Sequence, residues 1–188
     1  MMYILKSARY QAFEVYSRVL EPGDRAVDAT MGNGHDTLTL CALVGENGHV
    51  DAFDVQVDAV RATEALLEKE GVRQRASLWN TGHEHMSEYV RQPVKAVLFN
   101  LGWLPGSDKV VRTRWETTLK AVDQGLKLLL PYGIMTICCY PGHEEGQEEL
   151  IRIDDRLRAL PKGYNVLRQD FINAAPGAPV CFVIQKQL

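Results

Sequence analysis

Glycines and polar side chains gather in one segment, Asp28–Thr37, which reads Asp-Ala-Thr-Met-Gly-Asn-Gly-His-Asp-Thr. Its two glycines follow an apolar run and precede a helical pattern, so they allow a tight turn and a close approach of the backbone to a ligand. A tight strand-to-helix turn without any ligand remains the alternative. We expect a nucleotide-type cofactor to contact Asp28, Thr30, Gly32, Asn33, Gly34, His35, Asp36 and Thr37.

The start of the following helix indicates which cofactor the turn binds. NAD-binding turns usually carry a third glycine where this chain has Thr37, preceded by Asp36. A carboxylate there would repel a pyrophosphate, whereas it can accept a hydrogen bond from the ammonium of an amino-acid tail. The residues therefore favour S-adenosylmethionine over NAD.

Further cofactor contacts are expected where the next two strands end. Asp54 stands where ribose hydroxyls need an acceptor, and Gln56 is close enough to reach ribose or adenine. The loop 80–85 lies at the same sheet edge, which makes Gly82 and His83 candidates for the adenine edge. Asp54 could instead cap a helix. The His-x-His pair in the loop lacks a matched third ligand, so no metal site is expected.

Asn100 ends a further apolar run and opens the segment 100–106, which should face the reactive end of the cofactor. Its carbonyl oxygen can accept a hydrogen bond from an incoming amine without stabilising the ammonium form, and Trp103 can stack on a planar base. Asp108 or His143 could take the amine's proton, and the sequence does not choose between them. The alternatives are that Asn100 only fixes the loop, Trp103 belongs to the core or an interface, and His143 caps a helix.

A basic cluster follows this loop. Lys109, Arg112 and Arg114 are opposed only by Asp108, so the cluster could hold phosphates, although such clusters are also common on solvated surfaces. The formal net charge of −3 means that nothing global draws the chain to a polyanion. Nucleic-acid binding would therefore depend on this local cluster.

The elements that position these residues alternate between short apolar runs and segments of helical period, which is typical of a largely parallel α/β sheet. Two last strands without a helix between them should form an antiparallel pair. We expect helices at 7–20, 36–44, 58–71, 119–130 and 144–160, the fourth ended by Pro131-Tyr132-Gly133. We expect seven strands, at 25–29, 49–54, 76–80, 94–100, 134–140, 164–171 and 180–185.

Length and composition fit one domain spanning residues 1–188. The chain is 46% hydrophobic and 24% charged, as in ordinary soluble proteins. No apolar run approaches the roughly 18 residues that span a bilayer, and no signal peptide is evident, so we expect a cytoplasmic protein without membrane contact. The four cysteines lack metal-ligand spacing and are expected to be buried and reduced.

Five stretches of the sequence, taken together, resemble one family. They are residues 28–37, 53–56, 82–84, 99–109 and 140–143, and the most specific of them covers Asn100 to Lys109. The chain resembles the YtqB/MnmM-like family of class I S-adenosylmethionine-dependent methyltransferases, formerly labelled rRNA methylases. It departs from the common family pattern at Trp103, Ser107 and Ala174, where Tyr, Gly and Gln are frequent.

The resemblance implies a Rossmann-like fold, a homodimer and a reaction on tRNA. The implied substrate is 5-aminomethyl-2-thiouridine at the tRNA wobble position, which is methylated to 5-methylaminomethyl-2-thiouridine. The partner would be the anticodon region, whose base can be splayed onto Trp103, with Tyr140 on the substrate side and phosphates on the basic cluster. Methylation of rRNA or of a small amine, and non-catalytic cofactor binding, remain the alternatives.

Overall fold

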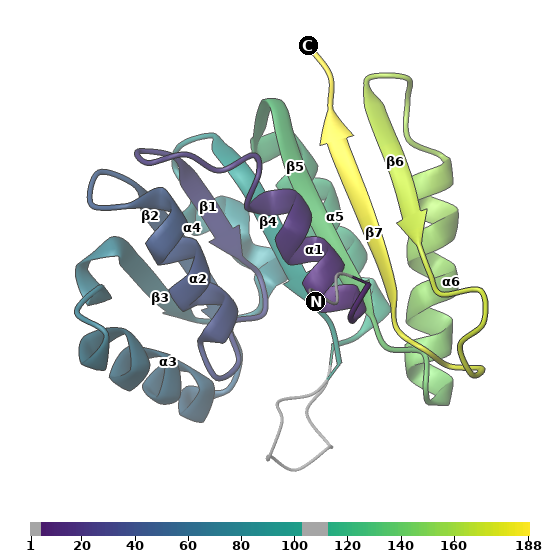
Figure 1. The fold of residues 1–188 in the computed structure, drawn as a ribbon, viewed down its shortest axis with the longest axis horizontal. Coiled ribbons are helices and arrows are strands. Elements are labelled where there is room, and N and C mark those ends of the chain that lie inside the picture. The colour runs from purple at the N-terminus through teal and green to yellow at the C-terminus, as the bar shows by residue number, and fades with distance from the viewer. Residues whose placement is uncertain (1–4, 103–112) are drawn as a thin grey trace.

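One mixed sheet organises the computed structural model, which describes residues 5–102 and 113–188 (Figure 1). The strand order is β3-β2-β1-β4-β5-β7-β6; the first five run parallel to one another, and β7 is antiparallel to both β5 and β6. The expected mostly parallel sheet with an antiparallel C-terminal pair is confirmed. The bounds are β1 Arg25–Asp28, β2 His49–Asp54, β3 Ala76–Asn80, β4 Val94–Asn100, β5 Leu129–Cys139, β6 Tyr164–Gln169 and β7 Val180–Lys186.

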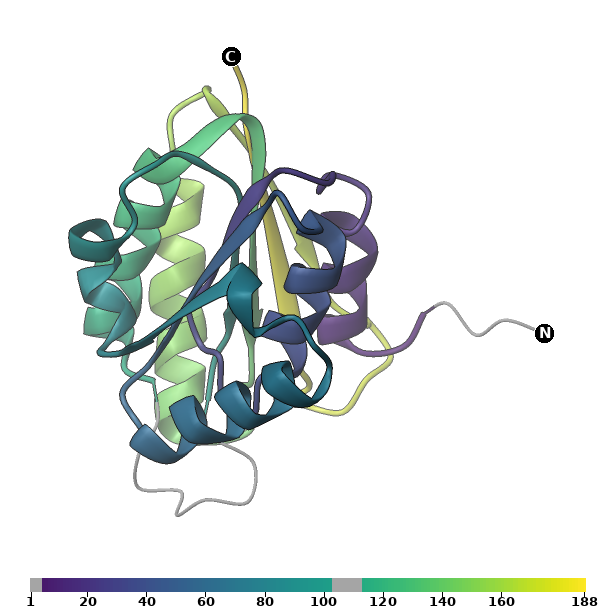
Figure 2. The same cartoon turned by 90° about the vertical axis from the view of Figure 1, so that its left-hand side faces the viewer.

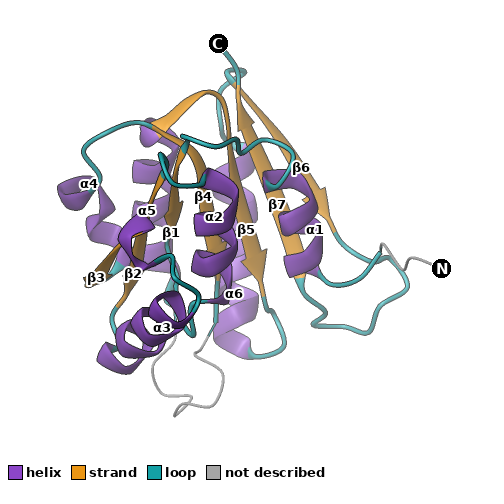
Figure 3. Cartoon of the chain, turned by 60° about the vertical axis from the view of Figure 1, so that its left-hand side comes forward, coloured by secondary structure: helices purple, strands orange, loops and turns teal. Residues whose placement is uncertain are grey.

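Helices cover both faces of the sheet, which makes a three-layer arrangement (Figures 2 and 3). One face carries α1 (Ala8–Tyr16), α2 (His35–Val44) and α3 (Val57–Lys69). The other carries α4 (Met86–Tyr89), α5 (Trp115–Leu128) and α6 (Glu144–Arg158). Two short 3-10 helices, η1 (Arg73–Arg75) and η2 (His83–His85), flank β3.

Successive side chains along each strand point to opposite faces of the sheet and fill two hydrophobic cores, one on each face. On β4, Val97 and Phe99 join the cluster under α5 and α6, whereas Ala96 and Leu98 join the cluster under α1 and α2. This period of two follows from side chains pointing to opposite faces of a strand. Each fully buried large side chain of these clusters contributes roughly 1.5 to 3 kcal/mol to folding. Burial on both faces explains why the central strands read as continuous apolar runs.

The parallel strands bring their carboxyl ends to one edge of the sheet. The order in which strands are added to the sheet reverses at β1, which pairs in parallel with β2 on one side and β4 on the other. Ligands of open α/β sheets bind in the crevice outside such a switch point. Asp28, Asp54 and Asn100 each end one of these three strands, so the fold brings them to the same edge.

The region between α5 and β5 differs from the sequence expectation. We expected a helix through residue 130 and a strand from 134, but α5 ends at Leu128 and β5 begins at Leu129, which pairs with Val94. The register then shifts so that Ala96 pairs with Ile134, and Tyr132 between them has a φ of 60°. The spacing of Leu129 and Leu130 fitted either a helix or a strand, and the pairing of Leu129 with β4 places both leucines in the strand. The first helix and the sixth strand are also shorter than expected, ending at Tyr16 and Gln169.

Gly34 packs closely against Thr63 behind the glycine-rich turn, and a substitution there tests this packing. Its φ is +82°, and a Cβ would lie 2.9 Å from the Thr63 backbone, whereas Gly71 has a φ of +69° with nothing within 4 Å of an added Cβ. Gly34→Ala should therefore lower the free energy of unfolding by about 2 to 3 kcal/mol, and Gly71→Ala by about 1 kcal/mol. Urea unfolding of both variants measures the difference. Equal losses would show that the contact with Thr63 contributes nothing.

Candidate active site

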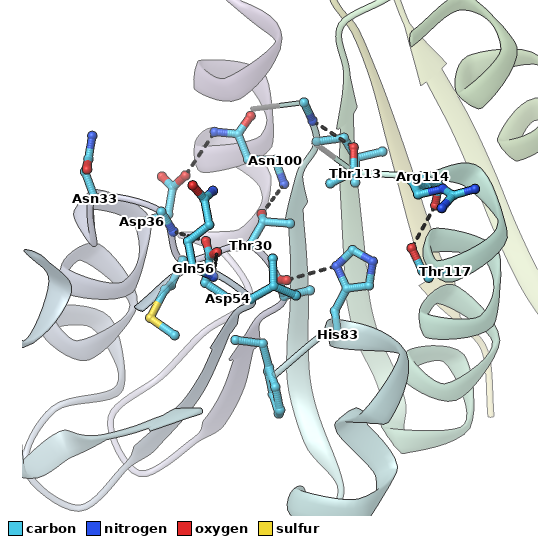
Figure 4. Close-up of a pocket in the computed structure, with 18 of the residues that line it drawn as sticks. Thr30, Asn33, Asp36, Asp54, Gln56, His83, Asn100, Thr113, Arg114 and Thr117 are labelled. Atoms are coloured by element: carbon cyan, nitrogen blue, oxygen red, sulfur yellow. Dashed lines mark hydrogen bonds between the residues drawn. The ribbon is translucent and has the colours of Figure 1, made fainter. Parts of the chain in front are cut away.

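A cavity of about 610 Å³ opens at the carboxyl edge of the sheet (Figure 4). Its volume lies within the range of small-molecule sites, roughly 300 to 1,000 Å³. The loops after β1, β2, β3 and β4 line it together with parts of α1 and α5. Of the residues expected from the sequence, it is lined by Thr30, Gly32, Asn33, His35, Asp36, Asp54, Gln56, Gly82, His83, Asn100, Arg114 and Tyr140.

The other expected residues fall into two groups. Trp103, Asp108, Lys109 and Arg112 lie outside the described residues, so their predicted roles stay predictions. The second group is described by the structure but does not line the cavity, and it consists of Asp28, Gly34, Thr37 and His143.

Asp28 holds the glycine-rich turn from behind. Thr37 Oγ1 donates to one carboxylate oxygen of Asp28 at 2.6 Å, and the Thr30 N–H donates to the other at 3.1 Å. Burial raises the pKa of Asp28 to about 7, nearby Asp36 adds to the rise, and the two hydrogen bonds oppose it. Asp28 and Thr37 therefore hold the turn in shape, and neither forms part of the surface that faces the cavity.

Asp54 joins the turn to the end of β2. Its carboxylate accepts the Gly32 N–H at 3.1 Å and the Gln56 N–H at 2.9 Å. Burial raises the pKa of Asp54 while these two hydrogen bonds lower it. Asp54 also lines the cavity, and a carboxylate has about four acceptor sites, so the group can still accept a hydrogen bond from a ligand.

His83 forms part of the cavity wall as a neutral ring. Its Nδ1 lies 3.1 Å from the Ala29 carbonyl oxygen, which can only accept, so Nδ1 carries the hydrogen and Nε2 is left as an acceptor. Burial lowers the pKa of His83. The ring packs edge-on against Phe99 at a centroid distance of 5.7 Å, which fixes its orientation.

Asp36 is the centre of a network across three elements. Arg9 of α1 donates from Nε to both Asp36 oxygens, at 2.9 and 3.0 Å, and its Nη2 lies 2.8 Å from Oδ1. Asn100 Nδ2 donates to Asp36 at 3.4 Å, and Tyr140 donates its hydroxyl to Asn100 Oδ1 at 2.7 Å. The Asn100 N–H also donates to Thr30 Oγ1 at 2.8 Å, a contact drawn in Figure 4.

This network fixes which end of the Asn100 amide faces each neighbour. A carboxylate accepts hydrogen bonds only, so the nitrogen must face Asp36 and the oxygen must face Tyr140. Burial raises the pKa of Tyr140 well above neutral pH, so its hydroxyl keeps the proton it donates. The Asn100 carbonyl oxygen is thus oriented with one lone pair still available.

A buried carboxyl on α6 anchors the wall next to Asn100. Gly102 and Thr113 bind each other through two hydrogen bonds of 2.9 Å, from the Gly102 N–H to Thr113 Oγ1 and from the Thr113 N–H to the Gly102 oxygen. Glu149 accepts the hydroxyls of Thr113 at 2.9 Å and Thr118 at 2.7 Å. Burial raises the pKa of Glu149, and both hydroxyls oppose the rise.

His143 serves as the N-cap of α6. Its Nδ1 accepts the Gly146 N–H at 3.0 Å, and it does not line the cavity. The structure thus agrees with the helix-cap alternative.

In the described ranges, 5–102 and 113–188, no cluster of His, Cys, Asp and Glu is suited to a metal ion.

Several cavity residues escaped prediction from the sequence. Arg9, Thr113 and Thr117 line the cavity, and Glu149 supports it, yet none belongs to a local motif. Arg9 lies 27 positions from its partner Asp36, so no spacing in the sequence could indicate the pair.

Within the part of the chain that the structure describes, no helix is both long and apolar enough to cross a bilayer.

Comparison with known proteins agrees with this geometry. The family model described as "Putative rRNA methylase" matches residues 50–185. The chain belongs to this rRNA methylase family. A chloroplastic tRNA (mnm(5)s(2)U34)-methyltransferase of Arabidopsis thaliana is 39% identical over 166 residues, which cover 83% of this chain. The matched region spans 61% of the Arabidopsis protein's own length.

Solved structures of methylases share the whole fold. A structure described as a "putative rRNA-methylase" from Clostridium thermocellum is 39% identical with a TM-score of 0.96, covering 98% of this chain and all of that one. A "putative methyltransferase" from Streptococcus mutans, solved with S-adenosylhomocysteine, is 31% identical with a TM-score of 0.88, covering 97% and 99%. The rRNA methylase-family chain therefore has the class I methyltransferase fold expected from its motifs.

Asp28 makes the stability of this methylase-family chain depend on pH. A carboxyl whose pKa is raised to about 7 in the folded state stabilises the fold below its unfolded pKa and loses that contribution as the pH rises to about 7. Between pH 5.5 and 8, the unfolding free energy of the wild type should fall by about 2 kcal/mol relative to Asp28→Asn. Chemical denaturation at both pH values measures this. Asp58→Asn, whose side chain is 89% exposed, should keep the wild-type dependence; the same dependence in Asp28→Asn would contradict the account.

Proposed function

We propose that this protein is an S-adenosylmethionine-dependent N-methyltransferase that converts 5-aminomethyl-2-thiouridine at the tRNA wobble position to 5-methylaminomethyl-2-thiouridine. The observation that carries the proposal is the oriented carbonyl oxygen of Asn100 at the wall of the cavity. The name of the Arabidopsis relative supports the tRNA substrate. Since the matched region spans only part of that relative, the substrate is an inference for this chain.

The cavity fits the parts of S-adenosylmethionine. Asp54 has lone pairs for the ribose hydroxyls, with Gln56 beside it, while Gly82 and the neutral His83 would flank the adenine. The Streptococcus mutans protein, solved with S-adenosylhomocysteine, supports this cofactor. When bound, S-adenosylmethionine supplies a methyl group on a positively charged sulfur.

The Arg9–Asp36 ion pair suits the cofactor's amino-acid end. That end carries an ammonium and a carboxylate, and the pair presents one charge of each sign to the cavity. Asp36 would accept a hydrogen bond from the ammonium. Arg9 keeps N–H groups beyond those bound to Asp36, and these would face the carboxylate.

Asn100 would prepare the substrate amine. An alkylamine with a pKa of about 10.4 is mostly protonated at neutral pH, and releasing the proton costs about 4 to 5 kcal/mol. The neutral carbonyl oxygen of Asn100 accepts one amine N–H and leaves the nitrogen lone pair directed at the methyl group. With the cofactor bound, the amine nitrogen would take the methyl group as the sulfur leaves as a neutral thioether, and the resulting ammonium would release a proton. Asp108 remains the proposed proton acceptor, because His143 lies outside the cavity lining.

The RNA would enter from the side of Arg114. This exposed arginine lines the cavity at the start of α5, and Thr117 one turn later lines it too. We propose that Arg114, together with Lys109 and Arg112, holds phosphates of the anticodon region and that Trp103 stacks on the splayed base. Tyr140 is assigned to the substrate side because its hydroxyl binds the Asn100 oxygen.

We further propose that residues 1–188 form one domain, since both cores share one sheet. A single cooperative unfolding transition would test this, and two separate transitions would contradict it. A cytoplasmic location is proposed from the four free cysteines, which suit a reducing compartment. Recovery of the protein in a membrane or extracytoplasmic fraction of its cells would contradict the location.

A second candidate is methylation of rRNA, which the family description favours. Both candidates use the same cofactor cavity and differ only in the RNA. Purified protein incubated with tRNA, rRNA and free alkylamines separates them, since the proposed function predicts methyl transfer to tRNA alone. Transfer to rRNA with none to tRNA would select the second candidate.

Asn100→Ala should lower methyl transfer about 100-fold, because it removes the acceptor that orients the amine. Affinity for S-adenosylhomocysteine should stay within about threefold, since Asp54 and the glycine-rich turn are unchanged. The assay is mass spectrometry of nucleosides from treated tRNA, with calorimetry for the cofactor. Asn47→Ala, exposed in the turn between α2 and β2, is the control and should match the wild type. Full activity in Asn100→Ala would contradict the proposed role.

We also propose a homodimer that buries apolar side chains near the β6 edge. Leu167 of β6 is 53% exposed, and Ile172 after the strand is 100% exposed. A strand at a sheet edge with exposed apolar groups is a common pairing surface. Leu167→Arg with Ile172→Ser should shift the sedimentation of the protein from dimer to monomer, whereas Leu188→Ser, 93% exposed at the C-terminus, should not. A monomeric wild type would contradict the dimer.

A further inference from the structure

A second cavity of about 300 Å³ lies between α1 and α2. Lys6, Ser7, Tyr10 and Phe13 line it on the α1 side. Arg9 and Asp36 line both this cavity and the proposed active site, so the two cavities share a wall. An occupant of the second cavity would be the immediate neighbour of an occupant of the first.

The lining combines a cation with aromatic rings. The Lys6 ammonium lies 4.2 Å from the Tyr10 ring centroid, and the Tyr10 and Phe13 rings are 6.0 Å apart. Arg9 and Asp36 neutralise each other, which leaves Lys6 as the excess positive charge of the lining. An ammonium beside aromatic rings is the combination with which proteins hold single-stranded nucleic acid: the cation binds the phosphate and a ring stacks on the base.

Lys6 and Tyr10 are accessible to a ligand, unlike the core residues beneath them. Phe13 packs against the core under α1, but Lys6 is exposed and Tyr10 is only partly buried. Within residues 5–102 and 113–188, no carboxylate forms an ion pair with Lys6. Among the described residues its ammonium therefore lies over the Tyr10 ring and pairs with no carboxylate, so a phosphate can draw it away from the ring.

We infer that this α1–α2 cavity binds the nucleotide that flanks the target base in the substrate strand. The phosphate of that nucleotide binds Lys6, and its base stacks on the Tyr10 ring face that the ammonium vacates. The inference rests on the proposed function, because it requires an RNA substrate whose target base lies in the adjoining cavity. It adds a contact surface on α1, which covers the opposite face of the sheet from α5 (Figure 1).

The test measures binding of an anticodon stem-loop carrying 5-aminomethyl-2-thiouridine, by fluorescence anisotropy over a series of KCl concentrations with saturating S-adenosylhomocysteine. Lys6→Ala should lower the slope of log Kd against log [KCl] by about 0.7, the value for one phosphate contact on a single strand. Tyr10→Leu should weaken binding about tenfold and Tyr10→Phe less than twofold, because only the first removes the ring. Lys127→Ala, exposed in the last turn of α5, is the control for the loss of one positive charge.

Affinity for S-adenosylhomocysteine, measured by calorimetry, should be unchanged in every variant, which shows that the variants fold. Stem-loop affinity and salt slope equal to wild type in both Lys6→Ala and Tyr10→Leu would overturn the nucleotide site while leaving the tRNA function standing. A slope change in Lys127→Ala equal to that of Lys6→Ala would also overturn it. A wild type that binds S-adenosylhomocysteine but neither binds nor methylates the stem-loop would overturn the proposed function and this inference together.

Discussion

The carboxylate of Asp36 ties together the parts of the chain that make the site. It receives Arg9 from the N-terminal helix and the amide nitrogen of Asn100 from the end of β4. Without this acceptor the Tyr140 hydroxyl could bind either end of the Asn100 amide, because a hydroxyl both donates and accepts, and the oxygen would lose its fixed direction. The contacts with Arg9, at 2.8 to 3.0 Å, are charge-assisted and strong because they are partly withdrawn from water, and the longer contact of 3.4 Å orients Asn100. One carboxylate on α2 thus joins groups from two other elements. The proposed chemistry depends on that fixed direction.

Burial of carboxyl groups is the electrostatic cost of building this site at a sheet edge. Asp28, Asp54 and Glu149 all have raised pKa values, and desolvation is the largest cause in each. Each is compensated by N–H or O–H donors from the loops it holds. The same hydrogen bonds therefore satisfy the buried groups and shape the cavity wall. A cofactor with hydroxyl and ammonium groups complements such a lining better than a pyrophosphate would.

Local sequence signals predicted what is decided locally. The runs 49–54 and 94–100 are strands with the expected bounds: both are short, mostly buried and end at a polar residue. The predicted end of the helix at residue 130 was wrong, because Leu129 pairs with Val94 as part of the sheet. This contact between distant positions overrode the helical spacing of the leucines. Asp54 and Asn100 were found as strand-end residues, whereas the pairing of Tyr140 with Asn100 across 40 positions leaves no local trace. Sequence reasoning thus located the site but not the network that orients it.

The central claim is that this chain methylates the aminomethyl group of the tRNA wobble uridine. The most direct measurement is mass spectrometry of tRNA nucleosides from cells that lack this gene and carry no redundant enzyme. The account predicts that 5-methylaminomethyl-2-thiouridine disappears, that 5-aminomethyl-2-thiouridine accumulates, and that the wild-type gene reverses both changes. Unchanged levels of the methylated nucleoside in the deletion strain would contradict it.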